Sequence, residues 1–215
     1  MIFLKKNLLD TILIIPAILI AFTFHEYAHA WVADKLGDKT PKFQGRLTLN
    51  PLAHIDPIGF IMILIFNFGW AKPVEVNPSA FRNYYKDDLK VSIAGPLANL
   101  LVAFVFSGII AIIYKIVPGI IYSRNIIYII LKVFYITIQM NCMFAFFNIM
   151  PIPGLDGFHI LRDIFPGKFY KFSDVMYRYQ LVILMLFIVV PGVTNFLVGR
   201  PASFVYSLFL NIFNI

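Results

Sequence analysis

The sequence predicts an all-α polytopic membrane protein, formed as one integral membrane domain over residues 1–215. Hydrophobic residues make up 60% of the chain and charged residues 13%, and the mean hydropathy is +0.81. Soluble domains are typically about 45–50% apolar and about 25% charged. Four apolar runs of helical length alternate with short polar segments. These segments leave no room for a separate soluble domain.

The charge of the chain fits the same interpretation. A net charge of +7 would suggest nucleic acid as a partner of a soluble protein. Here the lysines and arginines fall in short segments between apolar runs, where they set topology and meet anionic headgroups. We therefore expect the lipid bilayer as a partner and no nucleic acid. The single cysteine, Cys142, excludes an intramolecular disulfide and a Cys-based zinc site, and is expected to be a small core residue.

The first span is expected at residues 8–33, with Pro16 tolerated inside it. Lys5, Lys6 and the Ala28-His29-Ala30 triplet resemble a secretory signal with its cleavage site. The apolar run is longer than the ~7–15 residues of a signal core, so we interpret it as a retained span.

Residues 44–77 are expected to be re-entrant or extended and β-like. Residues 44–49 alternate weakly, as a short strand does. Residues 58–68 are apolar but well short of the ~20 residues that a spanning helix needs, which favours a re-entrant, interfacial or buried piece. Residues 70–77 carry two prolines and alternating valines, which favour an extended segment.

Two further spans are expected at residues 91–116 and 126–150, and a fourth at 179–197. The third ends in a segment broken by Pro151 and Pro153. Residues 201–215 form a short apolar tail that hydropathy does not place.

The first span contains the motif His25-Glu26-x-x-His29. On a helix, residues four apart project from one face, so the two imidazoles lie side by side. That spacing suits one zinc ion, and Glu26 then lies beside the metal, where a general base is needed.

A catalytic zinc usually has three protein ligands and one open position. The candidates for the third ligand are His54, Asp56, Asp156 and His159. Asp156 stands out because it follows the proline-broken end of a span. Irregular backbone at membrane depth is tolerated where it lines a cavity or is buried in protein, and an ionisable residue there indicates a functional site.

Four motifs in order resemble the site-2 protease family of intramembrane metalloproteases, in its minimal form without PDZ or CBS domains. They are His25-Glu26-x-x-His29, Gly69-Trp70-Ala71-Lys72-Pro73-Val74, Gly95-Pro96-x-x-Asn99, and Asn148-x-x-Pro151-x-Pro153-x-x-Asp156-Gly157. The resemblance covers roughly residues 20–160. It implies a three-helix catalytic core with additional C-terminal spans, one Zn²⁺ held by His25, His29 and Asp156, and Glu26 as the catalytic base. Gly154 stands where relatives often carry proline, which is expected to loosen the approach to Asp156.

The function implied is that of a zinc-dependent endopeptidase that cleaves transmembrane segments of other proteins with metal-activated water, as in regulated intramembrane proteolysis. Asn148 is a candidate for hydrogen bonding the substrate backbone or the developing oxyanion; its alternative role is to satisfy backbone groups freed by Pro151. The competing function is a transporter or structural membrane protein with a non-catalytic metal site. Lys132, Gln139 and Asn141 in one span would suit a polar path, but no inverted repeat accompanies them.

The shared metal ion constrains the topology. His25 lies roughly 12 Å inside one face of the membrane and Asp156 just beyond the third span. An even number of crossings must separate them, so residues 58–68 should dip in and return. Twelve basic residues at 35–90 and 162–178 then share the metal-proximal side, against four (Lys5, Lys6, Lys115 and Arg124) opposite. This bias predicts a multi-pass protein of the cell membrane with its metal near the cytoplasmic face.

Overall fold

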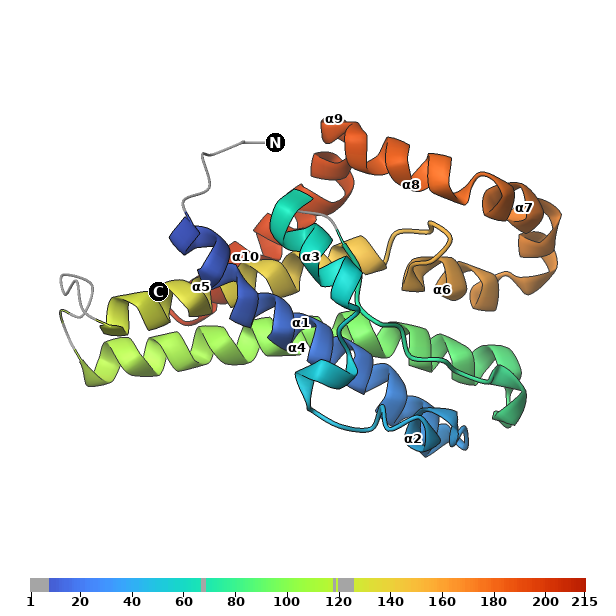
Figure 1. Cartoon of the computed structure of the whole chain (residues 1–215), viewed down its shortest axis with the longest axis horizontal. Helices are drawn as coiled ribbons and strands as arrows, with labels where there is room; N and C mark the ends of the chain where they lie inside the picture. The colour runs from blue at the N-terminus through green and yellow to red at the C-terminus, as the bar shows by residue number, and fades with distance from the viewer. Residues whose placement is uncertain (1–7, 67–68, 118, 120–125) are drawn as a thin grey trace.

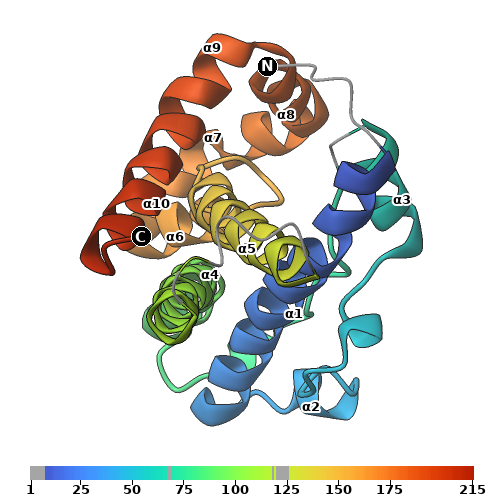
Figure 2. The same ribbon diagram turned by 90° about the vertical axis from the view of Figure 1, so that its left-hand side faces the viewer.

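The computed structural model describes residues 8–66, 69–117, 119 and 126–215. Three long helices form its centre: α1 (Leu8–Leu36), α4 (Tyr84–Ile116) and α5 (Ile126–Asn148). They pack together with α4 antiparallel to α1 and α5 (Figure 1, Figure 2). Each contains a stretch long and apolar enough to cross a membrane. The predicted all-α polytopic membrane fold is therefore confirmed.

Small buried residues let the helices approach one another. Ala17, Ala21, Ala30 and Ala33 of α1 are all fully buried. Small side chains at helix interfaces allow close packing in a membrane, where lipid tails compete with apolar contacts. Cys142 of α5 is also fully buried, as expected of a small core residue.

The chain between α1 and α4 folds back on itself. It contains α2 (Thr40–Phe43), η1 (Pro51–Ala53), α3 (Pro57–Phe66) and η2 (Pro78–Ala80). Ile55 and Ala71 form an antiparallel bridge, and the Lys72 N–H donates to the His54 carbonyl at 2.9 Å. The chain thus leaves along α3, which is about 15 Å long at 1.5 Å per residue, and returns to its starting point.

The two limbs of this return touch through glycines. A Cβ at Gly59 would overlap the backbone of Trp70, and one at Gly69 would overlap the backbone of Gly59. Of the 58–68 stretch, residues 67–68 lie outside the described part of the chain.

The β-like character expected of residues 44–77 is limited to that single bridge within the described residues. The expected short strand at residues 44–49 does not form. Gly45 turns the chain with φ +69°, and the buried Arg46 guanidinium donates to the carbonyls of Ala53 and Lys72. The Arg46 side chain therefore occupies carbonyls that a neighbouring strand would otherwise pair with. Residues 70–77 run extended and, among the residues that the structure describes, are not part of a sheet.

The C-terminal part differs from the expected single span at 179–197. It consists of α6 (Asp156–Ile164), α7 (Pro166–Arg178), α8 (Gln180–Val189), α9 (Pro191–Thr194), the π-helical η4 (Asn195–Gly199) and α10 (Arg200–Ile212). The path bends by 80° between residues 180–187 and 192–212, next to a Pro-Gly pair that interrupts helices.

The tail that hydropathy could not place becomes α10. It packs along α5 and contacts α4 (Figure 2). Ala202 is buried in one cluster with Ile110 of α4 and Ile138 of α5, and Phe209 and Phe213 contact the ring of Phe104. Residues 201–212 are therefore part of the helical core.

Candidate metal centre

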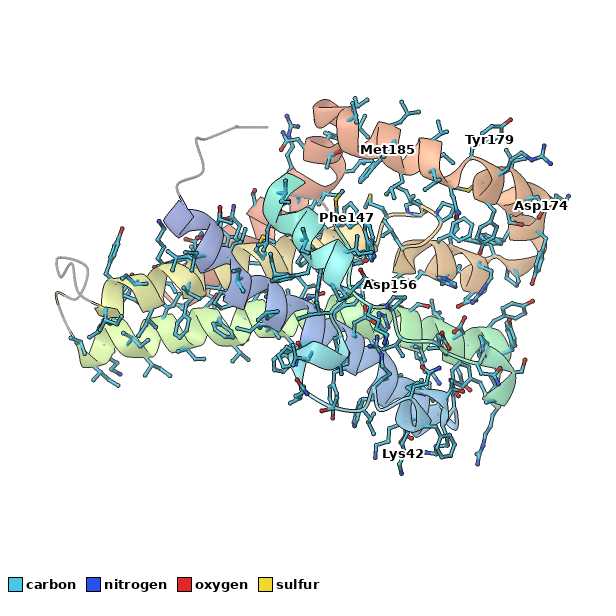
Figure 3. The ribbon with its side chains drawn as sticks, in the orientation of Figure 1. Lys42, Phe147, Asp156, Asp174, Tyr179 and Met185 are labelled. Atoms are coloured by element: carbon cyan, nitrogen blue, oxygen red, sulfur yellow. The ribbon has the colours of Figure 1, made fainter. Side chains whose placement is uncertain are left out.

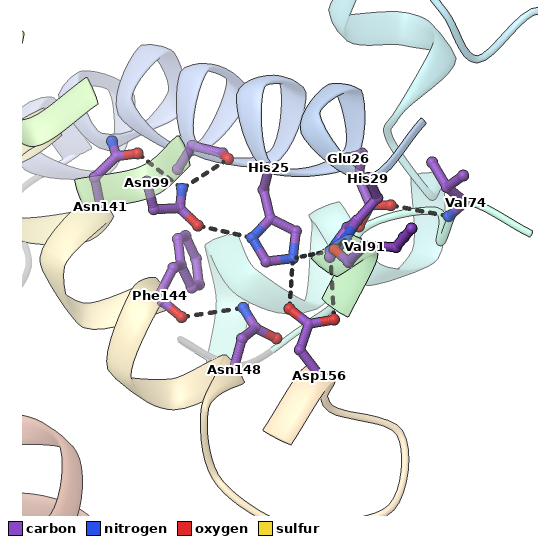
Figure 4. Close-up of polar contacts among 11 residues, drawn as sticks. His25, Glu26, His29, Val74, Val91, Asn99, Asn141, Phe144, Asn148 and Asp156 are labelled. Atoms are coloured by element: carbon purple, nitrogen blue, oxygen red, sulfur yellow. Dashed lines mark hydrogen bonds and ion pairs between the residues drawn. The ribbon is translucent and has the colours of Figure 1, made fainter. Parts of the chain in front are cut away.

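Three side chains from two elements converge on one point (Figure 4). His25 and His29 project from the same face of α1 and are both 7% exposed, while Asp156 is the first residue of α6. The two Nε2 atoms are 3.1 Å apart. Asp156 Oδ2 lies 3.2 Å from the Nε2 of His25, and Oδ1 lies 3.3 Å from the Nε2 of His29. Within the described residues, this is the cluster of His, Cys, Asp and Glu side chains that can hold a metal ion.

The hydrogen bonds of the two imidazoles are compatible with a cation at this point. Nδ1 of His29 is 2.7 Å from the Val91 carbonyl, which only accepts, so the proton is on Nδ1. Nδ1 of His25 is 2.8 Å from Oδ1 of Asn99. With Nδ1 protonated, each Nε2 presents a lone pair to the carboxylate of Asp156, whose Oδ2 is buried without a hydrogen-bond donor. Nitrogen and oxygen donors in this arrangement fit a zinc ion.

Gly95 permits α4 to lie against the imidazoles. A Cβ at this position would overlap atoms of both His25 and His29. The Gly95-Pro96 pair thus serves close packing, and Pro96 lies inside α4 without ending it.

The turn between α5 and α6 delivers Asp156 to the imidazoles. Gly154 adopts φ +93°, a value that proline cannot reach. Glycine at this position therefore shapes the turn that leads into Asp156. Gly157 packs directly on the Ile149 carbonyl, where a Cβ would not fit. Asp156 also lies in the first turn of α6, where the helix dipole favours a negative charge.

Glu26 is buried beside the histidines, with 7% exposure. Its Oε2 accepts a hydrogen bond from the Val74 N–H at 2.9 Å (Figure 4). Val74 belongs to the extended segment of residues 70–77, whose Asn77 N–H donates to Asp38 at 2.7 Å. The extended segment is thus held at its middle and at its C-terminal end, and it orients the Glu26 carboxylate.

Two cavities reach the site from different sides. One, of about 260 Å³, is bordered on its polar side by Asp88, His159 and Arg162. The other, of about 220 Å³, is bordered by the apolar rings of Phe22, Trp70, Phe144 and Phe147. Both share His25, Glu26 and Asn148 as lining residues. The polar cavity offers water a route, and the apolar cavity offers room for hydrophobic side chains.

Two of the other three candidate ligands have structural partners. His54 is fully buried and its Nε2 donates to the Thr48 carbonyl at 2.7 Å. Asp56 accepts from the Gly59 N–H at 2.8 Å at the start of α3. His159 borders the polar cavity; its burial, together with the charge of Arg162, lowers its pKa below the usual value.

Asn148 lies at the edge of both cavities, at the last residue of α5. Its Nδ2 donates to the Phe144 carbonyl at 3.0 Å. Because a carbonyl only accepts, this bond fixes the amide orientation, and Oδ1 points toward the side of Asp156 (Figure 4).

The sequence did not indicate several groups that complete the site. The Val91 carbonyl and the Val74 N–H are backbone atoms, and no residue type marks them. Arg162 of α6 pairs with Asp88 of α4, and this ion pair ties α6 to the core. Arg162 also pairs with Asp163 of its own helix at 2.8 Å. Phe147 in α5 precedes the broken turn, and Asp156 at the start of α6 follows it; both are labelled in Figure 3.

A buried His-Glu-x-x-His motif within a membrane-spanning helix, joined by a carboxylate from a second element, defines an integral membrane metallopeptidase. The sequence profile of Peptidase family M50 matches residues 13–189. The chain therefore belongs to this family, the site-2 protease family of zinc metalloproteases.

Individual relatives agree with this assignment. YwhC of Bacillus subtilis is 40% identical over 178 residues, which is 81% of this chain and 80% of YwhC. MJ0611 of Methanocaldococcus jannaschii is 31% identical over 146 residues, covering 66% and 64% of the two chains. Rip2 of Mycobacterium tuberculosis is 25% identical over 194 residues, covering 87% and 71%. All three names describe a zinc metalloprotease. No solved structure gives a significant match.

Proposed function

We propose that this zinc metalloprotease is an endopeptidase that cleaves transmembrane segments of other proteins. His25, His29 and Asp156 hold a single zinc ion, and Glu26 is the general base. The observation that carries the proposal is that two imidazole nitrogens and the partly buried carboxylate of Asp156 converge on one point beside the buried carboxylate of Glu26.

A zinc ion bound there supplies a Lewis acid and a water molecule of lowered pKa. Glu26 takes a proton from the attacking water at its carboxylate and returns it to the nitrogen of the cleaved peptide bond. The Val74 N–H holds Oε2 of Glu26, so the other oxygen, Oε1, is the one available for this transfer.

Asn148 is proposed to bind the substrate backbone. Its Oδ1 points toward the site while its amide nitrogen donates to the Phe144 carbonyl. In this orientation it accepts a hydrogen bond from a substrate N–H, which favours substrate binding over oxyanion stabilisation.

The apolar cavity supports a transmembrane segment as substrate. Its aromatic lining suits hydrophobic side chains, and it borders His25 and Glu26 directly. A helical segment must unwind before attack, because its amides are internally bonded. The extended residues 70–77, of which Trp70, Ala71 and Pro73 border this cavity, would align the unwound strand.

The competing transporter function finds less support. Lys132 and Gln139 border a separate cavity with Tyr114. Asn141 is fully buried and bonds to Asn99 on another face of α5. The three polar residues therefore do not line a common path.

We also propose that the metal lies near the cytoplasmic face of the cell membrane. The bridge between Ile55 and Ala71 supports the expected return of residues 58–68. Lys5, Lys6 and Arg124 lie outside the described residues. Cysteines placed at Lys39 and Ser79 should be labelled from the same side; labelling from opposite sides would contradict the topology.

The proposed function is tested by purified protein in liposomes with a reporter that carries one apolar transmembrane segment. Zinc analysis should find one ion per chain. Cleavage within the transmembrane segment is expected. A second reporter carries the same segment in a soluble, unfolded protein outside the bilayer, and the ratio of the two cleavage rates measures whether the bilayer is needed. A folded, zinc-loaded protein that cleaves neither reporter would refute the proposal.

A further inference from the structure

The imidazole of His25 is the end of a buried hydrogen-bond chain that crosses α5, α4 and α1 (Figure 4). Asn141 Nδ2 donates to the Thr137 carbonyl at 2.8 Å. Asn99 Nδ2 donates to Asn141 Oδ1 at 2.8 Å and to the Ala21 carbonyl at 3.0 Å. Asn99 Oδ1 lies 2.8 Å from Nδ1 of His25. Thr137, Asn141 and Asn99 are all 0% exposed.

Two backbone carbonyls fix the direction of every bond in this chain. A carbonyl only accepts, so the amide nitrogen of Asn141 must face Thr137, and its oxygen must face Asn99. The Ala21 carbonyl independently requires the amide nitrogen of Asn99 on its side. Both constraints leave the Asn99 oxygen facing His25, which must then donate through Nδ1–H.

We propose that Asn99 and Asn141 are positioning residues that hold His25 in the tautomer protonated at Nδ1, with the lone pair of Nε2 directed at the zinc. The inference rests on the proposed metal ligands. His29 obtains the same tautomer from the Val91 carbonyl alone. His25 meets a side-chain amide, which could present either end, and that amide is oriented by both the Ala21 carbonyl and Asn141.

A simple helix–helix contact would not account for this arrangement. Burying two amides in a membrane core is costly unless their groups are paired, and an apolar pair would avoid the cost. The chain also continues beyond the α4–α5 contact to a metal ligand and to the backbone of α1. Partners of metal-bound histidines commonly orient the ring in this way.

The test compares zinc affinity, by chelator competition in detergent, for wild type, Asn99→Leu and Asn99→Asp. Asn99→Leu removes the acceptor for Nδ1–H and should weaken zinc binding about 10–100-fold. Asn99→Asp keeps an acceptor and should stay much nearer wild type. Asn141→Leu removes one of the two groups that orient the Asn99 amide and leaves the Ala21 carbonyl, so it should give a smaller loss than Asn99→Leu.

Thr137→Val is the matched control. It removes a buried hydroxyl that donates to the Val133 carbonyl at 2.8 Å but keeps the Thr137 carbonyl that anchors Asn141. Its zinc affinity should equal that of wild type. A loss as large as that of Asn99→Leu would show that any disturbance of α5 has this effect, and would overturn the proposal.

Nitrogen NMR shifts of ¹⁵N-histidine-labelled protein read the tautomer directly, with a His25→Gln sample for assignment. A proton on Nδ1 of His25 is expected without and with zinc. A proton on Nε2 in the zinc-free protein, wild-type affinity in Asn99→Leu, or a loss of tenfold or more in Asn99→Asp would each overturn the inference. The comparison of Asn99→Asp with wild type decides the question even if Asn99→Leu fails to fold. Wild-type protein that binds no zinc would refute the proposed ligands instead, and the NMR shifts would still decide the tautomer.

Discussion

Gly95 of α4 lies so close to the imidazole of His29 on α1 that a methyl group at Gly95 would overlap the ring. Gly95→Ala should therefore push α4 away from α1 or displace the ring. Overpacking of this kind typically costs about 1–3 kcal/mol. The displaced ring should weaken zinc binding and abolish cleavage, measured by zinc content and the reporter assay.

Gly108→Ala in the same helix is the control. Its Cβ would approach the flexible end of Phe213, far from the metal ligands, at 3.3 Å. This variant should keep zinc and activity. Normal zinc content and cleavage in Gly95→Ala would show that α4 can yield without disturbing the histidines.

Glu26→Gln should separate zinc binding from chemistry. Glutamine can still accept the hydrogen bond from the Val74 N–H, so the fold and the zinc site should persist. It cannot take a proton, and general base catalysis typically contributes about 10²–10⁴-fold. The cleavage rate should therefore fall at least about 10²-fold, while the zinc content stays at the wild-type level.

The exposed Glu75, which accepts from Gln44 at 2.6 Å, provides the matched carboxylate. Glu75→Gln should cleave at the wild-type rate. Cleavage by Glu26→Gln within a few fold of wild type would refute the assigned base.

Zinc should stabilise the wild-type protein against heat through Asp156. A ligand that binds only the folded state adds about 2.7 kcal/mol at a concentration of 100 Kd. Chelation should therefore lower the melting temperature of wild type and stop cleavage, and added zinc should restore both. Asp156→Ala should show no such zinc-dependent shift.

Asp174→Ala on the exposed side of α7 is the control, since Asp174 lies away from the site (Figure 3). It should respond to zinc as wild type does. An equal zinc response in Asp156→Ala would mean that Asp156 is not a ligand.

The sequence predicted the parts of this protein that depend on local pattern. The His25-Glu26-x-x-His29 spacing places both imidazoles on one helix face, and the prolines before Asp156 mark a break that brings a carboxylate to them. The three long helices follow from length and hydropathy. These features are set by residue types that lie near one another in the chain.

The rest depends on distant contacts. The Val91 carbonyl and the Val74 N–H belong to residues whose side chains say nothing of these bonds. α10 is too short for hydropathy to place it, and only packing against α5 shows that it belongs to the core. Asn99 bonds to Asn141 of the neighbouring helix, as polar residues in membrane spans commonly do, but its link to His25 needs the helices in place.

The ion pair between Arg162 and Asp88 should hold α6, and with it Asp156, against α4. The Arg162 side chain is 15% exposed and that of Asp88 is 7%. Removing one partner of a buried pair leaves an unpaired charge and costs about 3–5 kcal/mol. Arg162→Gln should thus lower both stability, measured by unfolding in detergent, and zinc affinity.

The double variant Arg162→Gln with Asp88→Asn should recover part of the loss, because Asp88 is then no longer an unpaired charge, while Asp163 loses its partner in both variants. Lys39→Gln is the control, because it removes an ion pair with Asp34 in which the lysine side chain is 49% exposed. It should change the free energy of unfolding by no more than about 1 kcal/mol. Strictly additive losses in the double variant would show that Arg162 and Asp88 act separately. Asp156 would then owe its position to the Pro151–Gly157 turn alone, because no charge pair would link α6 to α4.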